Sequence, residues 1–264
     1  MDTLDNFVLT SAQIVSPQDT QVIVELGARD CQESLRFAKK FPHAKIFAFE
    51  CNDQTLPLCR AAIKDYPNIV LTEKAVSDRN GFITFYPIDP EKTETIWADG
   101  NPGASSLFKA SGKYPKENYV QKEVQVPTTR LDTFFRDNHI NEVALMWMDI
   151  QGAELMALKS MGEHIAKVKS IQTEVEFFEI YQGQAMFSEL HAYMEASGFI
   201  FVKFTYQSGY FGDAVYFNKR YMSGGQIAKY KLKNLLRNFK KSLWGFLRSI
   251  KHLVFGKPKP QTNA

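Results

Sequence analysis

Short apolar runs alternate with segments of helical spacing along most of this chain. Such runs, bounded by turn residues, are typical of strands buried in a parallel sheet, and the segments between them indicate covering helices. The last two runs are joined by a turn containing Gly209 and Gly212 instead of a helix, so the last strand should run antiparallel. We predict a doubly wound, mostly parallel α/β sheet. Its main strands are predicted at Val22–Leu26, Lys45–Glu50, Ile69–Lys74, Val143–Met148, Val168–Val175, Phe199–Phe204 and Ala214–Phe217.

The first two strands enclose the pattern of a nucleotide-binding unit. A strand, a tight turn at Gly27, a helix and a second strand ending in Glu50 form a βαβ unit. Glu50 is placed to accept hydrogen bonds from two ribose hydroxyls. A dinucleotide site needs three glycines in this turn, and only Gly27 is present. Asp30 would repel a pyrophosphate but tolerates the ammonium and sulfonium of S-adenosylmethionine. The loop therefore favours the methyl donor over a nicotinamide cofactor, which stays the third alternative.

The middle of the chain contains a turn signal and an irregular segment. Asn80-Gly81, followed by the alternating run Phe82–Tyr86, predicts a β-hairpin. Residues 87–120 are rich in Pro, Gly, Ser and Lys. A long connection of this kind is either an active-site lid or a mobile insertion, and both interpretations stay open. Within it, we expect Gly103–Leu107 to return over the cofactor.

Charge divides the chain into an acidic body and a basic tail. Of the 32 Lys and Arg residues, 12 lie from Lys219 onward, where no Asp or Glu occurs. The first 218 residues therefore hold 20 basic and 29 acidic residues, a net charge of −9. We expect a lead-in over residues 1–20, a catalytic domain over 21–218 and a basic amphipathic tail over 219–264.

The tail is predicted to form one long helix from Gln226 to Val254. Its apolar residues recur at spacings of three and four, with the cations mainly off that stripe, a pattern that suits an anionic membrane surface. The alternative is a helix packed on the domain or in an oligomer. Nucleic acid is not expected, because the aromatic side chains do not interleave with the cations.

Other sequence features bear on the cellular setting. Met1–Asn6 has no basic segment typical of a secretion signal, and no apolar run is long enough to span a bilayer. The three cysteines, Cys31, Cys51 and Cys59, contain no CxxC pair, which argues against a disulfide framework or a zinc site. We expect a cytoplasmic protein, with Cys31 and Cys51 acting as small apolar filler.

Ligands of open α/β sheets bind beyond the carboxyl ends of the strands, and the acids are concentrated there. The five histidines fall elsewhere, so a catalytic base should be a carboxylate. Asp149, which ends the most apolar strand, is the first candidate and Glu174 the second. The alternative for Asp149 is a helix cap. A divalent metal bridging Asp149 and Glu174 is only weakly indicated, and we assign no metal ligand.

At these motifs the chain resembles the FkbM-type S-adenosylmethionine-dependent methyltransferases. The resemblance covers about Val22 to Phe204 and is carried by an ordered set of blocks. The blocks are Glu25-Leu-Gly27-Ala28, Phe49-Glu50, Lys74-Ala75-Val76-Ser77-Asp78, Ser105-Ser106-Leu107, Thr129-Arg130-Leu131-Asp132 and Met148-Asp149-Ile-Gln151-Gly152-Ala-Glu154-Leu. The resemblance implies a seven-stranded class I methyltransferase fold, related to the Rossmann fold, with a hydroxyl as the usual methyl acceptor.

The same match assigns roles to individual residues. It implies that Glu50 binds the ribose, Ala75 and Val76 the adenine edge, and Asp149 the methionyl end or the acceptor. Arg29 and Cys31 stand where the family commonly has Asn and a second Gly; Arg29 could instead pair locally with Asp30. The expected donor-binding set is Glu25, Gly27, Ala28, Asp30, Glu50, Cys51, Ala75, Val76, Ser105 and Asp149.

The combined prediction is an S-adenosylmethionine-dependent O-methyltransferase that acts on a hydroxyl of a sugar, glycan or glycolipid. The alternative is a non-catalytic module that kept the fold and recruits a partner to the membrane.

Overall fold

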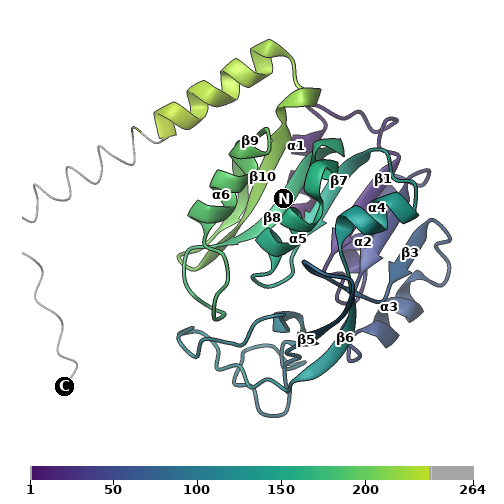
Figure 1. Ribbon diagram of the computed structural model, residues 1–264, viewed down its shortest axis with the longest axis vertical. Helices are drawn as coiled ribbons and strands as arrows, with labels where there is room; N and C mark the ends of the chain where they lie inside the picture. The colour runs from purple at the N-terminus through teal and green to yellow at the C-terminus, as the bar shows by residue number, and fades with distance from the viewer. Residues whose placement is uncertain (1, 238, 240–264) are drawn as a thin grey trace, which may run out of the picture. The chain divides into compact units, whose positions relative to one another are not determined.

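The computed structural model describes residues 2–237 and 239. Its main sheet has seven strands in the order β3-β2-β1-β7-β8-β10-β9 (Figure 1). All neighbours pair in parallel except β10, which is antiparallel to both β8 and β9. The predicted doubly wound sheet with an antiparallel last strand is confirmed. The bounds are β1 Val22–Leu26, β2 Lys45–Phe49, β3 Ile69–Thr72, β7 Val143–Met148, β8 Val168–Glu176, β9 Phe199–Gln207 and β10 Phe211–Asn218.

Helices cover both faces of this sheet, and the alternation of side chains along β7 explains how. Met146 and Met148 point into the core cluster formed with the helices α4, α5 and α6. Trp147, between them, points to the other face and contacts Phe7 of α1 and Phe37 of α2. Successive strand residues face opposite sides, so a fully apolar strand needs a helix layer on each. The helices are α1 Thr3–Ser11, α2 Gln32–Lys40, α3 Leu56–Ile63, α4 Leu131–Asp137, α5 Glu154–Ser160 and α6 Phe187–Ala196.

A second, three-stranded sheet has the order β4-β6-β5. Its strands are β4 Ala75–Val76, β5 Gly81–Phe85 and β6 Val124–Thr129. β6 lies between the other two, parallel to β4 and antiparallel to β5. The hairpin predicted at Asn80-Gly81 is therefore wrong: the chain bends at residues 78–80, but the strand that follows pairs with β6 instead of with the strand before it. In Figure 1 this small sheet lies at one end of the main sheet.

The chain between β5 and β6 contains a short 3-10 helix, η1, at Pro102–Ala104. Isolated β-bridges pair distant parts of this segment with one another. They join Tyr86 to Ser106, Ile88 to Gln121 and Glu94 to Asn118. One further bridge joins Ala110 to Tyr181 of the main domain. Backbone pairing at these points gives the irregular segment a defined path without regular strands.

The chain divides into two compact units, Met1–Met222 and Ser223–Ala264. The first ends after two further 3-10 helices, η2 Gly162–Lys167 and η3 Lys219–Tyr221. In the second, residues 224–237 are helical, and the rest of the predicted tail helix lies outside the described residues. Among the described helices, none has the length and apolar content needed to cross a membrane.

Candidate active site

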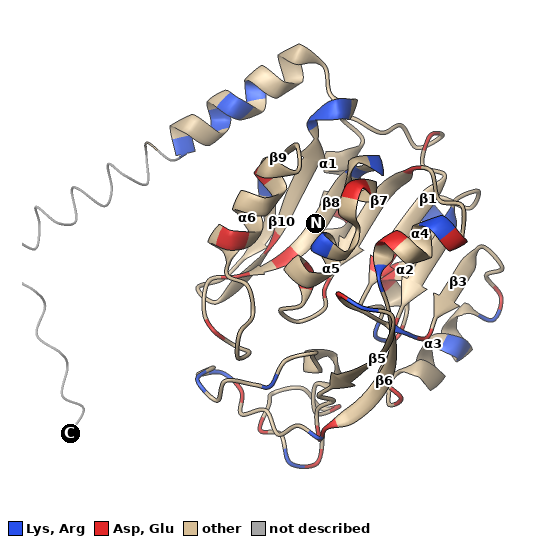
Figure 2. Ribbon diagram, in the orientation of Figure 1, with Lys and Arg blue, Asp and Glu red and all other residues tan. Residues whose placement is uncertain are grey.

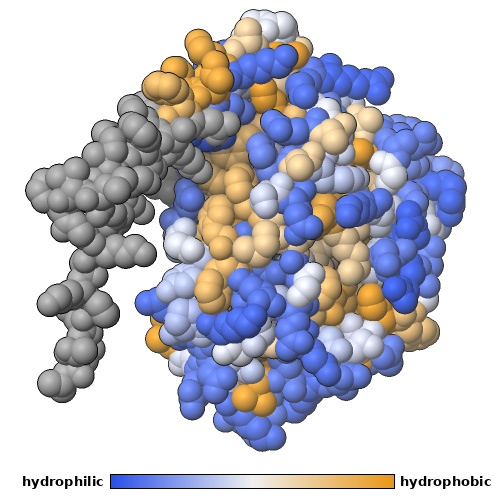
Figure 3. Space-filling model, turned by 60° about the vertical axis from the view of Figure 1, so that its left-hand side comes forward, coloured by the Kyte–Doolittle hydropathy of each residue, from blue (hydrophilic) through white to orange (hydrophobic). Residues whose placement is uncertain are grey.

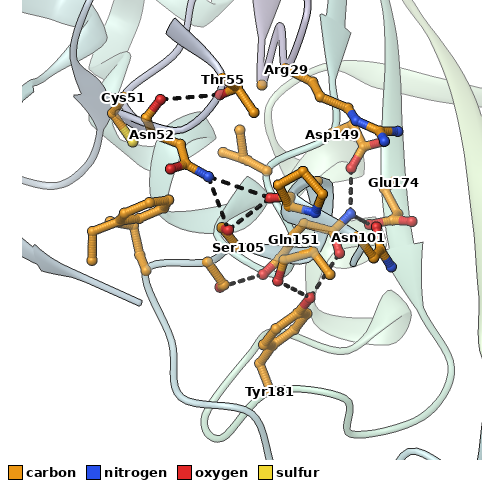
Figure 4. A pocket seen from close by; sticks show the side chains of 18 of the residues that line it. Arg29, Cys51, Asn52, Thr55, Asn101, Ser105, Asp149, Gln151, Glu174 and Tyr181 are labelled. Carbon is orange, nitrogen blue, oxygen red and sulfur yellow. Dashed lines mark hydrogen bonds between the residues drawn. The ribbon is translucent and has the colours of Figure 1, made fainter. Parts of the chain in front are cut away.

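A pocket opens where the strands β1, β2, β7 and β8 end (Figure 4). One wall comes from the loops after these strands, and the opposite wall from the small sheet and the segment between β5 and β6. The carboxyl edge of a parallel sheet is where ligands of this fold class bind. One half of the pocket lies near Gly27 and Glu50, and we call it the Glu50 half. The other half, near Asp149, Glu174 and Tyr181, we call the Asp149 half.

The first loop depends on Gly27. Gly27 has φ of +85°, and a Cβ added there would lie 1.8 Å from the backbone oxygen of Asp149. The N–H groups of Gly27 and Ala28 both donate to the backbone oxygen of Phe49, at 3.0 and 2.9 Å. Only glycine combines this conformation with such a close approach between the ends of β1 and β7.

Arg29 and Cys31 adopt left-handed conformations, with φ of +51° and +60°. Cys31 thus keeps the backbone shape typical of glycine, and its side chain is fully buried. The Arg29 guanidinium lies 2.6 Å from Asp99, in the segment between β5 and β6. Asp30 instead accepts the N–H of Gln32, at 3.3 Å. The local Arg29–Asp30 pair considered from the sequence does not form, because Asp99 takes the guanidinium.

Glu50 closes the same loop from the end of β2. Its Oε2 accepts the N–H of Arg29 at 2.8 Å, and its Oε1 accepts those of Cys51 and Asn52, each at 2.7 Å. Burial raises the pKa of Glu50, while the hydrogen bonds from Asn52, Cys51 and Arg29 oppose that rise. The carboxyl group is held in one orientation at the pocket wall.

An apolar slot lies beside Glu50. Ala75 and Val76, both nearly buried, share it with residues of β2, β5 and the segment after it. Burial raises the pKa of the Cys51 thiol well above its usual range, so this side chain stays uncharged. The slot is lined by Phe49, Cys51, Ala75, Val76, Phe85 and Leu107.

Ser105 fastens the segment between β5 and β6 to the Glu50 half. Its hydroxyl accepts from the Asn52 amide at 3.1 Å and from the N–H of Ile88 at 3.0 Å, and it donates to the backbone oxygen of Pro102 at 2.7 Å. Ser106 donates to the backbone oxygen of Gln151 at 2.7 Å. These bonds hold residues 102–107 on the pocket wall.

In the Asp149 half, one amide connects the two candidate catalytic acids. Gln151 Nε2 donates to Asp149 Oδ1 at 2.6 Å and to Glu174 Oε2 at 3.0 Å (Figure 4). The hydroxyl of Tyr181 lies 2.8 Å from Gln151 Oε1 and 2.7 Å from the backbone oxygen of Ala104, and its single proton serves one of them at a time. The amide orients both carboxyl groups, which leaves their remaining oxygens for a bound hydroxyl.

The acids of this half are crowded together. Asp149 is accessible from the pocket yet surrounded by protein, and this withdrawal from bulk water raises its pKa. Glu174 and Glu176 are 8% and 2% exposed, and burial together with the neighbouring acids raises both pKa values well above the usual range. Burial raises the pKa of Glu154 to about 8 and of Asp213 to about 7.

The carboxyl oxygens of Glu154, Glu174 and Glu176 lie within 4.8 Å of one another. This set differs from the pair Asp149 and Glu174 that the sequence weakly indicated for a metal. Glu154 already accepts the N–H of Ile150 at 2.8 Å, which is the role of an acid in a first helical turn.

Three residues of the expected donor-binding set are not on the pocket wall: Glu25, Ala28 and Asp30. Glu25 is fully buried and accepts the hydroxyl of Ser34 in α2. Its side chain points to the α2 face because it lies one position before Leu26, which points to the other side and lines the pocket. The other expected residues, Gly27, Glu50, Cys51, Ala75, Val76, Ser105 and Asp149, do line it together with Glu174.

Aromatic residues of the Asp149 half were not found from the sequence. Tyr119 stacks on Tyr181 with ring centroids 6.1 Å apart and planes at 15°, and Tyr114 contacts Tyr119 at 6.0 Å. Trp97 and Phe211 also line the pocket. Their sequence neighbourhoods carry no motif, so only an unusual number of Tyr and Trp residues in an irregular segment could have pointed to them.

The chain is similar to one protein family and to several solved structures. Residues 25–201 match the family model described as the methyltransferase FkbM domain. The 2-O-methyltransferase NoeI of Sinorhizobium fredii is 30% identical over 176 residues, which cover 65% of this chain and 71% of that protein. The structure is similar to the precorrin-6y C5,15-methyltransferase of Geobacter metallireducens (12% identity, TM-score 0.43, 81% of this chain and 88% of that one). It is also similar to the N-terminal domain of EvdMO1 with S-adenosylhomocysteine bound (12% identity, TM-score 0.45, 82% and 80%).

Proposed function

The chain belongs to the FkbM methyltransferase family, and we propose that it transfers a methyl group from S-adenosylmethionine to a hydroxyl group of a sugar, in a glycan or glycolipid. One observation carries this proposal. A single pocket joins a carboxylate and an apolar slot, suited to a nucleoside, to an oriented pair of acids, suited to a hydroxyl.

The Glu50 half has the groups that an adenosine requires. Two backbone N–H groups reach Oε1 of Glu50 and one reaches Oε2, so Oε2 keeps capacity for a ribose hydroxyl. The slot at Ala75 and Val76 lies on the same wall and offers apolar surface to a planar base. This arrangement supports Glu50 as the ribose ligand and the slot as the adenine site.

In the reaction, the acceptor oxygen attacks the methyl carbon as the bond from that carbon to sulfur breaks, and the bonding electron pair stays on sulfur. The acceptor proton passes to a carboxylate. Asp149 is the first candidate for this proton, because it is open to the pocket and oriented by Gln151. Most of the acceleration would come from holding the oxygen and the methyl group in line, with the base adding to it.

The sugar as acceptor is supported by two observations. NoeI, the relative described above, is a 2-O-methyltransferase. The aromatic faces of Tyr114, Tyr119 and Tyr181 next to Asp149 and Glu174 combine apolar surface with hydrogen-bond acceptors, and a sugar ring needs both.

The test is direct binding followed by product analysis. Calorimetry should show that the full-length protein binds S-adenosylmethionine and S-adenosylhomocysteine. Incubation with a methyl-labelled donor and a panel of glycans should then give a product that is one methyl group heavier by mass spectrometry. The absence of binding to both nucleosides would contradict the proposal; binding without any methylated glycan would favour the non-catalytic alternative.

We further propose that the basic tail binds the anionic, cytoplasmic surface of a membrane. On the helix over residues 224–237, Leu232, Leu235 and Leu236 are 52–66% exposed, and Phe239 extends the same spacing. Figure 2 shows Lys and Arg on this helix and no acids, and Figure 3 shows its apolar surface in orange. A helix with an exposed apolar stripe and only cationic charge suits an anionic interface.

Full-length protein is expected to sediment with phosphatidylserine-containing vesicles and to stay in the supernatant with pure phosphatidylcholine vesicles. Changing Leu235 and Leu236 together to Ser should abolish sedimentation, because both side chains would have to enter the interface. Leu9→Ser, at a similarly exposed position in α1, is the matched control and should sediment normally. If a chain ending at Ser223 still sediments, the tail is not the membrane contact.

A further inference from the structure

The Asp149 half of the pocket is rich in carboxyl groups and has few cationic side chains near them. Asp149, Glu174 and Glu176 all line the wall. The cationic residues on that wall, within the part of the chain that the structure describes, are Arg29 and Lys74. Arg29 is held by Asp99, and Lys74 follows β3 near the Glu50 half.

Among the acids on the pocket wall, Glu176 is the one that accepts no hydrogen bond from another residue. Its side chain is 2% exposed and faces the pocket. Within residues 2–237, no N–H or O–H group of another residue hydrogen-bonds to its carboxyl group, and no Lys, Arg or His nitrogen lies within 4.0 Å of it. The donor to this carboxyl group is the backbone N–H of Glu176 itself, which replaces only part of the hydration that burial removes. Glu176 therefore requires a proton or a bound cation.

The surroundings favour an organic cation over a metal ion. Tyr119 is stacked on Tyr181, and Phe211, also on the wall, pairs with Glu176 across the strands β10 and β8. Aromatic faces attract ammonium groups and offer no ligands to a divalent metal. Of the three clustered carboxyl groups, that of Glu154 already accepts a backbone N–H, which leaves Glu174 and Glu176 for a ligand.

We propose that the acceptor is an amine-bearing sugar whose ammonium group binds Glu174 and Glu176 while its hydroxyl faces Asp149. This inference rests on the proposed methyltransferase function and specifies that the acceptor is positively charged. Because a bound ammonium favours the ionised carboxylates, its binding also releases protons from the two acids, whose pKa values are raised in the free protein.

The test is calorimetry on full-length protein saturated with S-adenosylhomocysteine, with a glucosamine trisaccharide and its fully N-acetylated counterpart as probes. The amine-bearing probe should bind at least about tenfold more tightly, a difference of ~1.4 kcal/mol. Measurements in two buffers of different ionisation enthalpy should show proton release for this probe alone. Glu176→Gln should remove the preference, whereas Glu163→Gln, the same change at an exposed position in η2, should keep it.

Each contrary outcome is distinct. Equal affinity for the two probes, with S-adenosylhomocysteine bound, would show that the acceptor's amine is not recognised. The methyltransferase proposal would then still stand. Failure to bind S-adenosylhomocysteine overturns the methyltransferase proposal itself. Weaker binding of S-adenosylhomocysteine by Glu176→Gln would assign the carboxyl group to the donor's own ammonium. Binding of Mg²⁺ or Mn²⁺ that is lost in Glu176→Gln, without a probe preference, would make the cluster a metal site.

Discussion

Replacing Glu50 with alanine is expected to lower the affinity for S-adenosylhomocysteine by about 100-fold or more. The change removes the proposed acceptor of the ribose hydroxyls and frees the N–H groups of Arg29, Cys51 and Asn52 that now hold the loop. A hydrogen bond to a charged acceptor contributes about 1.5–3 kcal/mol, so losing the bond to the ribose and loosening the loop together account for this factor. Calorimetry with the nucleoside measures it directly.

Two controls separate binding from folding. Glu50→Gln keeps one carbonyl acceptor and should lie between wild type and Glu50→Ala in affinity. Glu163→Ala, at an exposed site far from the pocket, should bind like wild type. Circular dichroism should show that Glu50→Ala is folded. An affinity within about threefold of wild type in folded Glu50→Ala would mean that Glu50 only shapes the loop.

Asp149→Asn is expected to reduce kcat by about 10²–10⁴ while leaving the affinity for S-adenosylhomocysteine nearly unchanged. Asparagine has the same shape and can still accept the Gln151 amide, but it cannot take the acceptor proton. The backbone oxygen of Asp149 that faces Gly27 is unaffected. Steady-state kinetics on a methylated glycan identified by the product screen separate kcat from KM.

The pH profile provides the matching control. Because its surroundings raise the pKa of Asp149, wild-type kcat should fall as pH decreases through that raised pKa, where the base becomes protonated. Asp149→Asn should lack this decline and show low activity throughout. If Glu174→Gln instead abolishes the decline and Asp149→Asn keeps it, Glu174 is the base, as its hydrogen bond to the same amide allows.

The Glu50 half was largely predictable because its signals are local. A buried strand, a glycine turn, a helix and an acid at the next strand end follow one another within about thirty residues, and β-strand pairing then places Gly27 and Glu50 together. Even in this half, the motif did not predict where the side chain of Glu25 points. Glu25 belongs to the matching motif, but the alternation of β1 turns its side chain towards Ser34.

The Asp149 half depends on contacts between distant parts of the chain. Tyr181 reaches Ala104 across 77 residues and Gln151 across 30, and no local pattern encodes either contact. The pairing of β5 with β6, instead of with β4 just before it in the chain, also depends on tertiary contacts. A strand pairs where its apolar side chains become buried, and the local sequence does not specify that place.

The sequence by itself determined the sheet, its antiparallel last strand, the family and the strand ends at which acids gather, because these follow from periodicity and short motifs. Only the tertiary structure decided which acids share a partner and which lack one. Gln151 bridges Asp149 and Glu174, while Glu176 faces the pocket without a donor from another residue. The physical reason is that hydrogen bonding and burial act through distances of a few ångströms in space, and the chain order does not specify those distances.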